Sequence, residues 1–327
     1  MVAFTRRAAL AAPLAVVSSP GRAQSWRPGG QVRIIVPAAA GGTTDIMARL
    51  LAQHLQAKWG TPVVVENRAG AGGTIGTLEM VRARPDGTTL MLGNIGPQAI
   101  AYSLFRNLPY RAEQIVPIAG TIRGPNVLVV NPSVPARTVA ELAALLRAQP
   151  GRIPYASTGV GQSTHLSPVL MLQMLGAEAI HVPLRGSAPA QIEILAGNVA
   201  FLIDNLTGII GHIQAGRLRA LAVTSAERHT LLPDVPAMRE TMPELATYEV
   251  NTWFGLFGPA ALPAGIVNSL NAEVMELLAL PETQRRFAEL GGVGMPGDAE
   301  AFAAFVRGEI AKWAEVVRKE GLQIDAG

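Results

Sequence analysis

Cysteine is absent from the 327 residues of this sequence. A chain without cysteine can form no disulfide, no thiolate metal site and no lipid anchor attached through an N-terminal cysteine. Aromatic residues are also few, and four Trp and four Tyr do not predict an aromatic pocket. The polypeptide must therefore be stabilised by its apolar core, for which 49% hydrophobic residues give ample material.

The first 23 residues have the pattern of a secretory signal peptide. Arg6 and Arg7 form a basic start, the apolar stretch AALAAPLAVVSS follows, and Gly21-Arg22-Ala23 places small residues at the cleavage spacing. The apolar stretch is well short of the ~20 residues that a membrane-spanning helix needs. The sequence therefore predicts export to a bacterial periplasm with cleavage after about Ala23. The arginine pair is compatible with twin-arginine export.

Charged residues make up only 16% of the chain, and no block of like charge occurs. Cleavage after residue 23 would remove three of the 27 basic residues and none of the 24 acidic ones, so that the two signs balance. A near-neutral protein has no electrostatic attraction to nucleic acid or to anionic membrane surfaces. We expect neither as a partner, and we expect a monomer.

The usual motifs of enzymes and cofactor sites are missing as well. The sequence has no GxxxxGK[ST] phosphate loop, and GAGGTIG (70–76) departs from a dinucleotide fingerprint because Ile75 stands where the third glycine belongs. GQSTH (161–165) lacks the final glycine of a G-x-S-x-G elbow. The five histidines show no metal-ligand spacing. We therefore predict no metal, no cofactor and no enzymatic activity, with a secreted hydrolase or lyase using Ser163 or His165 as the alternative.

Short apolar strands alternate with amphipathic helices along the chain, which indicates βαβ units and a mostly parallel sheet. One series ends near residue 125, a second runs from 126 to 246, and the remainder has one strand with helices and is too poor in strands to fold alone. We predict an α/β protein with a signal peptide at 1–23, a first lobe from 24–125 and 247–327, and a second lobe from 126–246. Two crossovers near 125 and 247 would act as hinges around a cleft.

Three local expectations follow from the same patterns. IVPIAGTI and NVLVVN, within residues 115–131, are expected as separate strands. Two helices are expected after residue 260, the second stopped by Gly321. Pro168 lies inside the expected helix STHLSPVLMLQML and should delay or kink its start.

The stretch VPAAAGGTTDI (36–46) joins a buried strand to a helix through a bare, glycine-bearing turn. A helix N-terminus carries about half a positive charge and free N–H groups, and ligands of open α/β sheets lie beyond the carboxyl ends of the strands. Gly41 and Gly42 would let these N–H groups approach an oxygen closely. An anion site is one reading of this turn, and ordinary capping by threonine is the other.

The second lobe contains two more turns of this kind, each joining a strand to a helix. ASTGVGQSTH (156–165) and LRGSAPA (184–190) each follow a strand, and the latter carries Arg185 and Ser187. Loops of this kind in both lobes could clamp a carboxylate at each end of a small molecule. Asp204 ends a strand, where it would accept from a ligand amine, order nearby loops or cap the following helix.

Nine segments resemble, in order, the tripartite tricarboxylate transporter substrate-binding proteins, the TctC-like or Bug family of periplasmic receptors. They are VRIIVPAAAGGTTDIMARLLAQHL, PVVVENRAGAGGTIG, PDGTTLMLGN, VLVVNPSVPARTVAEL, GVGQSTHLS, GSAPAQIEILAGNVAFLIDNL, GRLRALAVTS, LLPDVPAM and YEVNTWFGLFGPA, covering Val32 to Leu322. The resemblance implies a type II periplasmic-binding-protein fold and a cleft for a di- or tricarboxylate, an amino-dicarboxylate or an aromatic acid. It implies delivery to a membrane permease, with a membrane sensor as the alternative partner.

The resemblance also implies which residues contact the ligand. Thr74, Pro168 and the triplet Leu184-Arg185-Gly186 depart from the family pattern, which puts the identity of the ligand in doubt but not its class. Arg185 keeps the charge found there and adds a planar fork suited to carboxylates. The expected ligand-binding residues are Ala38, Ala39, Gly41, Gly42, Thr43, Thr44, Asn94, Ser157, Thr158, Ser163, Thr164, Arg185 and Asp204.

Overall fold

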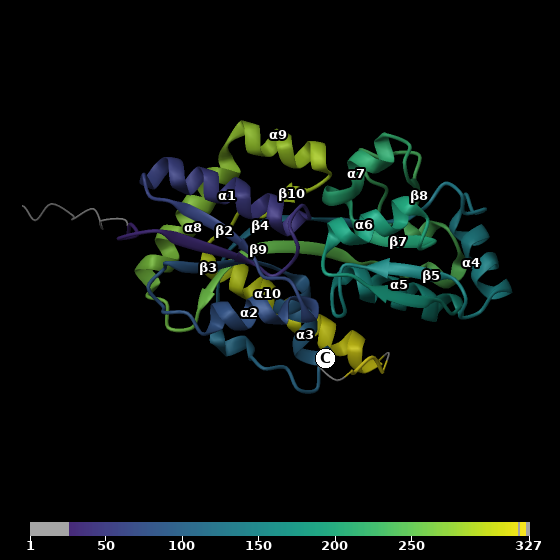
Figure 1. The fold of residues 1–327 in the computed structure, drawn as a ribbon, viewed down its shortest axis with the longest axis horizontal. Helices are drawn as coiled ribbons and strands as arrows, with labels where there is room; N and C mark the ends of the chain where they lie inside the picture. Colours follow the sequence, from purple (N-terminus) through teal and green to yellow (C-terminus); the bar gives the residue numbers. More distant parts are fainter. Residues whose placement is uncertain (1–25, 320, 325–327) are drawn as a thin grey trace, which may run out of the picture.

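The computed structural model describes residues 26–319 and 321–324 of the chain, and the predicted signal peptide lies outside this part. Two α/β lobes lie side by side along the long axis of the molecule (Figure 1). Their strands form one continuous path in the order β2-β1-β3-β9-β4-β7-β5-β6, with β8 and β10 paired to β4. The predicted fold class, an α/β receptor fold with two lobes, is confirmed.

The first lobe combines strands and helices from both ends of the chain. Its strands are β1 (Val32–Val36), β2 (Val63–Asn67), β3 (Thr89–Asn94), the first part of β4 (Ile115–Val130), β9 (Asn251–Pro259) and β10 (Val293–Gly294). Its helices are α1 (Thr43–Trp59), α2 (Thr74–Val81), α3 (Ala101–Leu104), α8 (Ala264–Ala279), α9 (Pro281–Leu290) and α10 (Ala299–Lys319). Strand β1 lies between β2 and β3 and is parallel to both.

The second lobe is formed by the middle of the chain. Its strands are the end of β4, β5 (Pro154–Ser157), β6 (Ile180–Pro183), β7 (Phe201–Asn205) and β8 (Arg219–Val223). Its helices are α4 (Val139–Ala148), α5 (Ser163–Leu175), α6 (Ser187–Ala196) and α7 (Leu206–Gln214). Strand β5 is parallel to β6 and β7, so the carboxyl ends of these three strands lie at one edge of the sheet.

Strand β4 joins the two lobes, and here the expectation of two separate strands is wrong. Residues up to Pro125 pair with β9, and from Asn126 onward the same strand pairs with β7. The register against β9 shifts twice, once after Pro117 and once after Gly120. The glycines and prolines of this segment therefore produce irregularities that bend one long strand, where the sequence pattern indicated a break between two strands.

Two other local expectations need correction. Helix α5 begins at Ser163 and runs through the buried Pro168, so its start is not delayed; only one backbone donor is lost. Helix α9 was not expected from the sequence. It begins with Pro281 and buries only Thr283, Phe287 and Leu290 along a charged segment, which left too weak an apolar stripe to recognise.

Apolar packing explains why these segments fold as they do. Strand β1 has Ile34, Ile35 and Val36 fully buried, as expected for a strand covered on both faces. Helix α1 turns Met47, Leu51 and Leu55 toward the sheet at helical spacing. One core cluster belongs to the first lobe, one to the second, and a third runs through both along β4.

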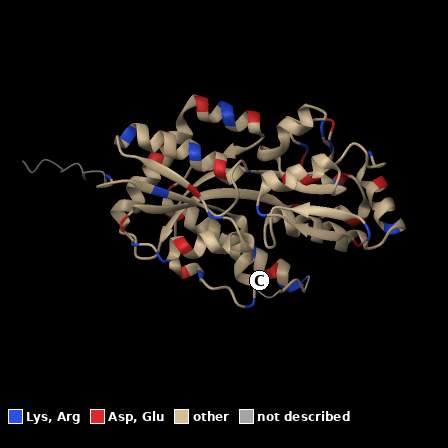
Figure 2. Ribbon diagram, viewed as in Figure 1, with Lys and Arg blue, Asp and Glu red and all other residues tan. Residues whose placement is uncertain are grey.

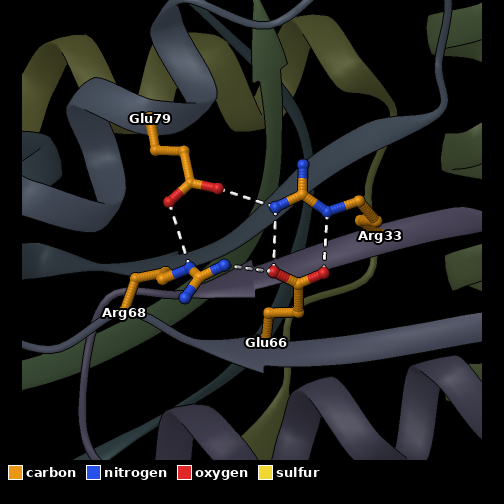
Figure 3. A network of polar contacts seen from close by, with 4 residues as sticks. All are labelled: Arg33, Glu66, Arg68 and Glu79. Carbon is orange, nitrogen blue, oxygen red and sulfur yellow. Dashed lines mark hydrogen bonds and ion pairs between the residues drawn. The ribbon is translucent and has the colours of Figure 1, made fainter.

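A network of four charged residues fastens the outer edge of the first lobe (Figure 3). Arg33 on β1 contacts Glu66 on β2 in a bidentate pair at 2.8 Å and Glu79 on α2 at 2.7 Å. Arg68 completes the ring with contacts of 2.8 Å to Glu66 and 3.1 Å to Glu79. The Arg33 guanidinium lowers the pKa of Glu66 below its ordinary value. The side chains are partly exposed, so each pair contributes at most about 1 kcal/mol.

Charged residues of both signs lie on both lobes. Figure 2 shows basic and acidic residues interspersed over both lobes. No helix in the described part of the chain is both long and apolar enough to cross a membrane.

Candidate ligand-binding cleft

A cavity lies between the lobes, at the carboxyl ends of strands from both. About 520 Å³ of space free of protein atoms lies there, part of it open to solvent. Strands β1, β2 and β3 lead into it from the first lobe, and β5, β6 and β7 from the second. Its lining comprises Pro37, Ala38, Gly42, Thr43, Thr44, Gly70, Ala71, Gly72, Gly73, Asn94, Thr158, Gln162, Leu184, Arg185, Gly186, Ser187 and Asn205.

Five helices begin at this cavity: α1 and α2 from the first lobe, and α5, α6 and α7 from the second. Their N-cap residues are Gly42, Gly73, Gln162, Gly186 and Asn205, and all five belong to the lining. None of the five accepts a capping hydrogen bond with its side chain. Each helix therefore directs backbone donors and the positive end of its dipole toward the same small space.

The charge of the lining has one sign. Among the described residues that line the cavity, Arg185 is the one charged side chain, and no carboxylate is present. Together with the five helix N-termini, Arg185 makes the cavity electropositive, although basic and acidic residues are equal in number after residue 23. Such a site favours an anion, because unpaired donors and aligned dipoles stabilise negative charge.

Polar side chains of the first lobe are held in place by buried hydrogen bonds. Asn94 donates to the hydroxyl of Thr44 at 3.3 Å and accepts from the Gly96 N–H at 2.9 Å. The Thr43 hydroxyl contacts the Thr207 hydroxyl of the second lobe at 2.7 Å. The cavity is thus lined by preorganised hydroxyl and amide groups, as recognition of a small polar ligand requires.

Asp45 fastens the loop after β1 from beneath. Its carboxylate accepts from the Gly41 N–H at 2.9 Å, from Arg49 at 2.9 Å and from Asn67 at 3.0 Å. Burial raises the pKa of Asp45, but these hydrogen bonds outweigh burial and hold it below its ordinary value. Asn67 also donates to the Ala38 carbonyl at 3.1 Å. Asp45 therefore shapes the loop without lining the cavity.

The loop after β5 has a similar support. The Thr164 hydroxyl accepts from the Thr158 N–H at 2.9 Å and contacts the Thr158 hydroxyl at 2.8 Å. The Ser157 hydroxyl contacts His181 Nε2 at 2.6 Å and accepts from the Gly159 N–H at 3.2 Å. Of these residues only Thr158 reaches the lining, and the others hold it there.

Two stacked histidines lie under this loop. The rings of His165 and His181 are 4.3 Å apart, and His165 Nδ1 accepts from the Gly161 N–H at 3.3 Å. Burial lowers the pKa of His165 to about 3, with the neighbouring ring adding to the effect, and lowers that of His181 to about 4. Both rings are therefore neutral at pH 7. Among the described residues, His181 contacts Ser157 and His165 contacts the Gly161 N–H, so neither ring is hydrogen-bonded to Ser163, the serine of the hydrolase alternative.

Asp204 is fully buried behind the second lobe's part of the cavity. It accepts from Ser187, from Gln191 at 2.9 Å and from the Asn205 N–H at 2.8 Å. Burial raises the pKa of Asp204, while these donors oppose the rise. Its oxygens are occupied by protein donors, and its role in this structure is to position Ser187 at the start of α6.

The structure brings seven of the thirteen expected residues to the cavity surface and leaves six outside the lining. The seven are Ala38, Gly42, Thr43, Thr44, Asn94, Thr158 and Arg185. The six are Ala39, Gly41, Ser157, Ser163, Thr164 and Asp204. Contact between a ligand and any of them stays a prediction.

Sequence reasoning missed a further stretch of the lining, Gly70–Gly73. The sequence contained a usable signal, because GAGG follows a strand and opens a helix just as VPAAAGG does. Gln162 was missed as well, since nothing in its local sequence shows which way its side chain points. Leu184 and Asn205 lie in segments that were expected near the cleft, but they were not among the expected ligand-binding residues.

The two lobes touch across the cleft. The Ala39 N–H donates to the Arg185 carbonyl at 3.1 Å, and Gln162 donates to the Gly72 carbonyl at 2.7 Å. With the Thr43–Thr207 contact, these bonds close the cleft from both sides. In the part of the chain that the structure covers, no cluster of three or more His, Asp or Glu residues is placed to hold a metal ion.

A two-lobed α/β fold with a closed, electropositive cavity between its lobes defines a class, the solute-binding receptors. The model of the tripartite tricarboxylate transporter family receptor, TctC, matches residues 47–322. The chain belongs to this family.

Relatives and solved structures agree with the assignment. Protein BugT of Bordetella pertussis is 36% identical over 324 residues, covering 98% of this chain and 96% of BugT. The structure of Rpa4515 from R. palustris with adipate matches with a TM-score of 0.86 at 34% identity, covering 90% of this chain and 98% of that one. MatC from Rhodopseudomonas palustris with bound malate matches with a TM-score of 0.84 at 31% identity, covering 89% and 99%.

Membership settles the broad function. The proteins of this family are periplasmic solute-binding receptors, so the chain is a solute-binding protein and not an enzyme. The predicted resemblance to TctC-like and Bug receptors is confirmed, and the hydrolase alternative built on Ser163 and His165 is set aside.

Proposed function

We propose that this protein captures a small organic carboxylate in the interlobe cleft and delivers it to the membrane permease of a tripartite tricarboxylate transporter. One observation carries the proposal: five helix N-termini from both lobes meet at one cavity whose lining, among the described residues, has no acidic side chain. Each dipole contact is worth at most ~2 kcal/mol, so binding requires several of them together.

The geometry suggests how the two lobes would divide the ligand. Thr44, Asn94 and the N–H groups after Gly42 would hold one carboxylate from the first lobe. Thr158, Arg185 and the N–H groups after Gly186 would hold the other end from the second lobe. Asp204 would act by fixing Ser187, not as a direct acceptor for the ligand.

Two points favour a di- or tricarboxylate over the amino-dicarboxylates and aromatic acids that the resemblance also allows. The related structures contain adipate and malate, both dicarboxylates. The described lining has no free carboxylate to receive an ammonium group and no aromatic ring to stack on an aryl acid.

Capture would use hinge closure of the predicted lobes, 24–125 with 247–327 against 126–246. Strand β4 changes partners between Pro125 and Asn126, and its partner β9 begins at Asn251, so the crossovers lie side by side. A ligand drives closure only if it binds the closed form better, and a change from 1:99 to 99:1 needs ~10⁴-fold preference.

Export to the periplasm is part of the proposal and is supported by the location of family members and by the leader pattern of residues 1–23. A membrane sensor is the alternative recipient. Capture of the liganded protein by permease subunits in detergent, and not by a sensor kinase, would separate the two.

The proposal is tested by thermal unfolding of the mature chain against a panel of mono-, di- and tricarboxylates. At 100 times its dissociation constant a ligand stabilises the protein by ~2.7 kcal/mol, which a melting experiment detects. We expect stabilisation by a dicarboxylate and a clearly smaller shift for Thr158→Val. A folded, ligand-free protein that responds to no carboxylate would contradict the proposal.

A further inference from the structure

A second, larger cavity adjoins the first on the solvent side. About 1340 Å³ of space free of protein atoms lies there, and this figure includes open solvent. The two cavities share Ala71, Gly72, Leu184 and Arg185 in their linings, so they are neighbouring chambers of one interlobe cleft. We call them the inner and the outer chamber.

The wall between the chambers is a contact between two glycine-bearing loops, one from each lobe. Gln162 donates from its side chain to the Gly72 carbonyl at 2.7 Å. The backbones are so close that a Cβ added at Gly72 would lie 2.0 Å from the Val160 carbonyl oxygen. Gly72 has φ +61°, which a glycine adopts without strain. The contact therefore depends on bare backbone on one side and on one long side chain on the other.

Gln162 faces the inner chamber while it makes this contact. It is only 7% exposed, and it belongs to the inner lining. Its carboxamide is confined on the first-lobe side as well, because a Cβ added at Gly96 would lie 2.6 Å from Gln162 Oε1. A ligand that filled the inner chamber and continued outward would have to displace this side chain.

The outer chamber has the chemistry of an apolar passage with one cation at its rim. Phe105, Val160, Leu184 and Ile324 contribute apolar surface to it. Arg185 borders both chambers, and its side chain forms no hydrogen bond or ion pair with any residue in the described ranges 26–319 and 321–324. A methylene chain followed by a second carboxylate would suit this space.

We propose that Gln162 is a specificity-determining residue that sets the maximum length of the ligand. By closing onto Gly72, its side chain seals the inner chamber over a short dicarboxylate and excludes longer ones from the outer chamber. This inference rests on the proposed function and deepens it.

The test is a calorimetric titration of linear dicarboxylates from succinate through adipate and suberate to sebacate. Wild-type affinity should fall beyond the length that the inner chamber holds. In Gln162→Ala the chambers merge, so the longer acids should bind more tightly, by up to about fourfold for each methylene that becomes buried. The shortest acid should bind about two- to tenfold more weakly, since one interlobe hydrogen bond is lost.

Thr207→Val serves as a matched control. It removes another interlobe bond, between Thr207 and Thr43, but Thr207 lines neither chamber. It should weaken all acids of the series by a similar factor and leave the length preference unchanged. Gln162→Asn is a second variant, which keeps the amide but is too short to reach Gly72, and it should resemble Gln162→Ala.

The outcomes separate this inference from the proposal beneath it. A longer optimal acid in both Gln162 variants, but not in Thr207→Val, supports the role of Gln162. Equal binding of succinate and sebacate by the wild type, or a parallel loss of affinity in all three variants, overturns it while leaving carboxylate capture intact. A wild-type protein that binds no member of the series, although a melting curve shows it folded, overturns both.

Discussion

At the residue scale, Asp45 shows how a buried carboxylate can serve an anion site without repelling the anion. Its negative charge is paired with Arg49, and the N–H groups of Gly41 and of the Asn67 side chain stabilise it by hydrogen bonds. The carboxylate lies 3% exposed beneath the loop, so the donors of Gly42 and Thr43 remain free to face the cavity. An acid in the sequence of a binding loop is therefore compatible with an acidic ligand.

Replacing Asp45 tests this role. Asp45→Asn should lower the free energy of unfolding by about 2 kcal/mol at pH 7, because hydrogen bonds to a charged acceptor are lost. It should also weaken ligand binding, since the loop loses its support. The pKa of Asp45 lies below its ordinary 3.8, so its stabilisation is present above that pH and is lost as the pH falls below it. Urea unfolding at several pH values measures the loss of stability and its dependence on pH.

Asp86 provides the control. Its carboxylate accepts from the Thr88 N–H at 3.0 Å in a surface turn, and Asp86 is not part of the cavity lining. Asp86→Asn should lower stability without changing the dissociation constant. Equal losses of affinity in both variants would mean that the effect of Asp45 is not local to the loop.

The histidine pair predicts a second pH dependence, which comes from two rings that burial keeps neutral and not from a charged carboxylate. The folded-state pKa values of His165 and His181, about 3 and about 4, lie below the ordinary 6.5. Below pH 6.5 the unfolded chain therefore binds more protons than the folded one. The stabilisation should be complete above pH 6.5 and decrease as the pH falls toward 4.

Chemical unfolding of the wild type and of His165→Asn between pH 7.5 and pH 4.5 measures this dependence. We expect a stability that falls with decreasing pH in the wild type and a shallower fall in the variant. A wild-type stability that rises on acidification would contradict the assignment of two neutral, buried rings.

The sequence predicts which loops reach the cavity better than which of their side chains line it. Thr44 and Thr158 line the cavity, whereas Ser163 and Thr164, in a similar sequence context, do not. Hydroxyl residues at a helix start can face a ligand, the backbone or one another. Which one occurs depends on the packing of the neighbouring strand, and this information is not contained in the local sequence.

At the scale of elements, the strand-to-helix turn is the unit that builds the site. The chain uses it after β1 and β2 in the first lobe and after β5, β6 and β7 in the second. A parallel strand brings each turn to the same edge, and a glycine or amide at the N-cap leaves the donors free for a ligand. The turns were predictable because each has a strand pattern before it and a helix pattern after it.

The elements that were not predictable lack such a signal. Strand β4 runs through Gly120, Gly124 and Pro125, residues that normally end a strand, because it pairs with β9 and then with β7. Helix α9 carries too little apolar surface to be recognised. In both cases tertiary contacts decide the structure over local preference.

The turns of the two lobes approach each other closely across the cleft, which predicts the effect of adding a side chain to a glycine there. Gly186 has φ +132°, and an added Cβ would lie 2.9 Å from the Ala39 backbone of the other lobe. Gly186→Ala should therefore destabilise the closed form and weaken ligand binding at least about tenfold, in addition to a backbone strain of about 1–3 kcal/mol.

Gly176→Ala is its matched control. Gly176 also has a positive φ, +58°, at the end of α5, but an added Cβ would meet no atom within 4 Å. It should cost stability while leaving the dissociation constant unchanged. Titration calorimetry on both variants decides the matter, and unchanged binding by Gly186→Ala would contradict the interlobe contact.

At the scale of the whole molecule, the two lobes share β4 and a core that runs through both of them. This continuity allows bending at the change of partner near Pro125 and Asn126 without a flexible linker. The two-lobed organisation was predictable from the order of strands and helices. The extent of closure was not, because it depends on contacts such as Thr43–Thr207 between residues 164 positions apart.

Closure should be visible in solution. Small-angle scattering should show a smaller radius of gyration when a saturating dicarboxylate is added, because the ligand joins donors of both lobes. Thr207→Val should require more ligand for the same compaction, by a factor of about two to ten. A radius that stays constant while the ligand binds would contradict hinge closure.

The most direct test of carboxylate capture compares a dicarboxylate with its uncharged diamide of the same shape. Titration calorimetry of the mature chain with malate or adipate and with the corresponding diamide measures what the charge contributes. We predict one bound dicarboxylate per chain and at least about a hundredfold weaker binding of the diamide, since helix N-termini and Arg185 stabilise negative charge. Equal affinities for the acid and the diamide would show that the cleft does not select its ligand by charge.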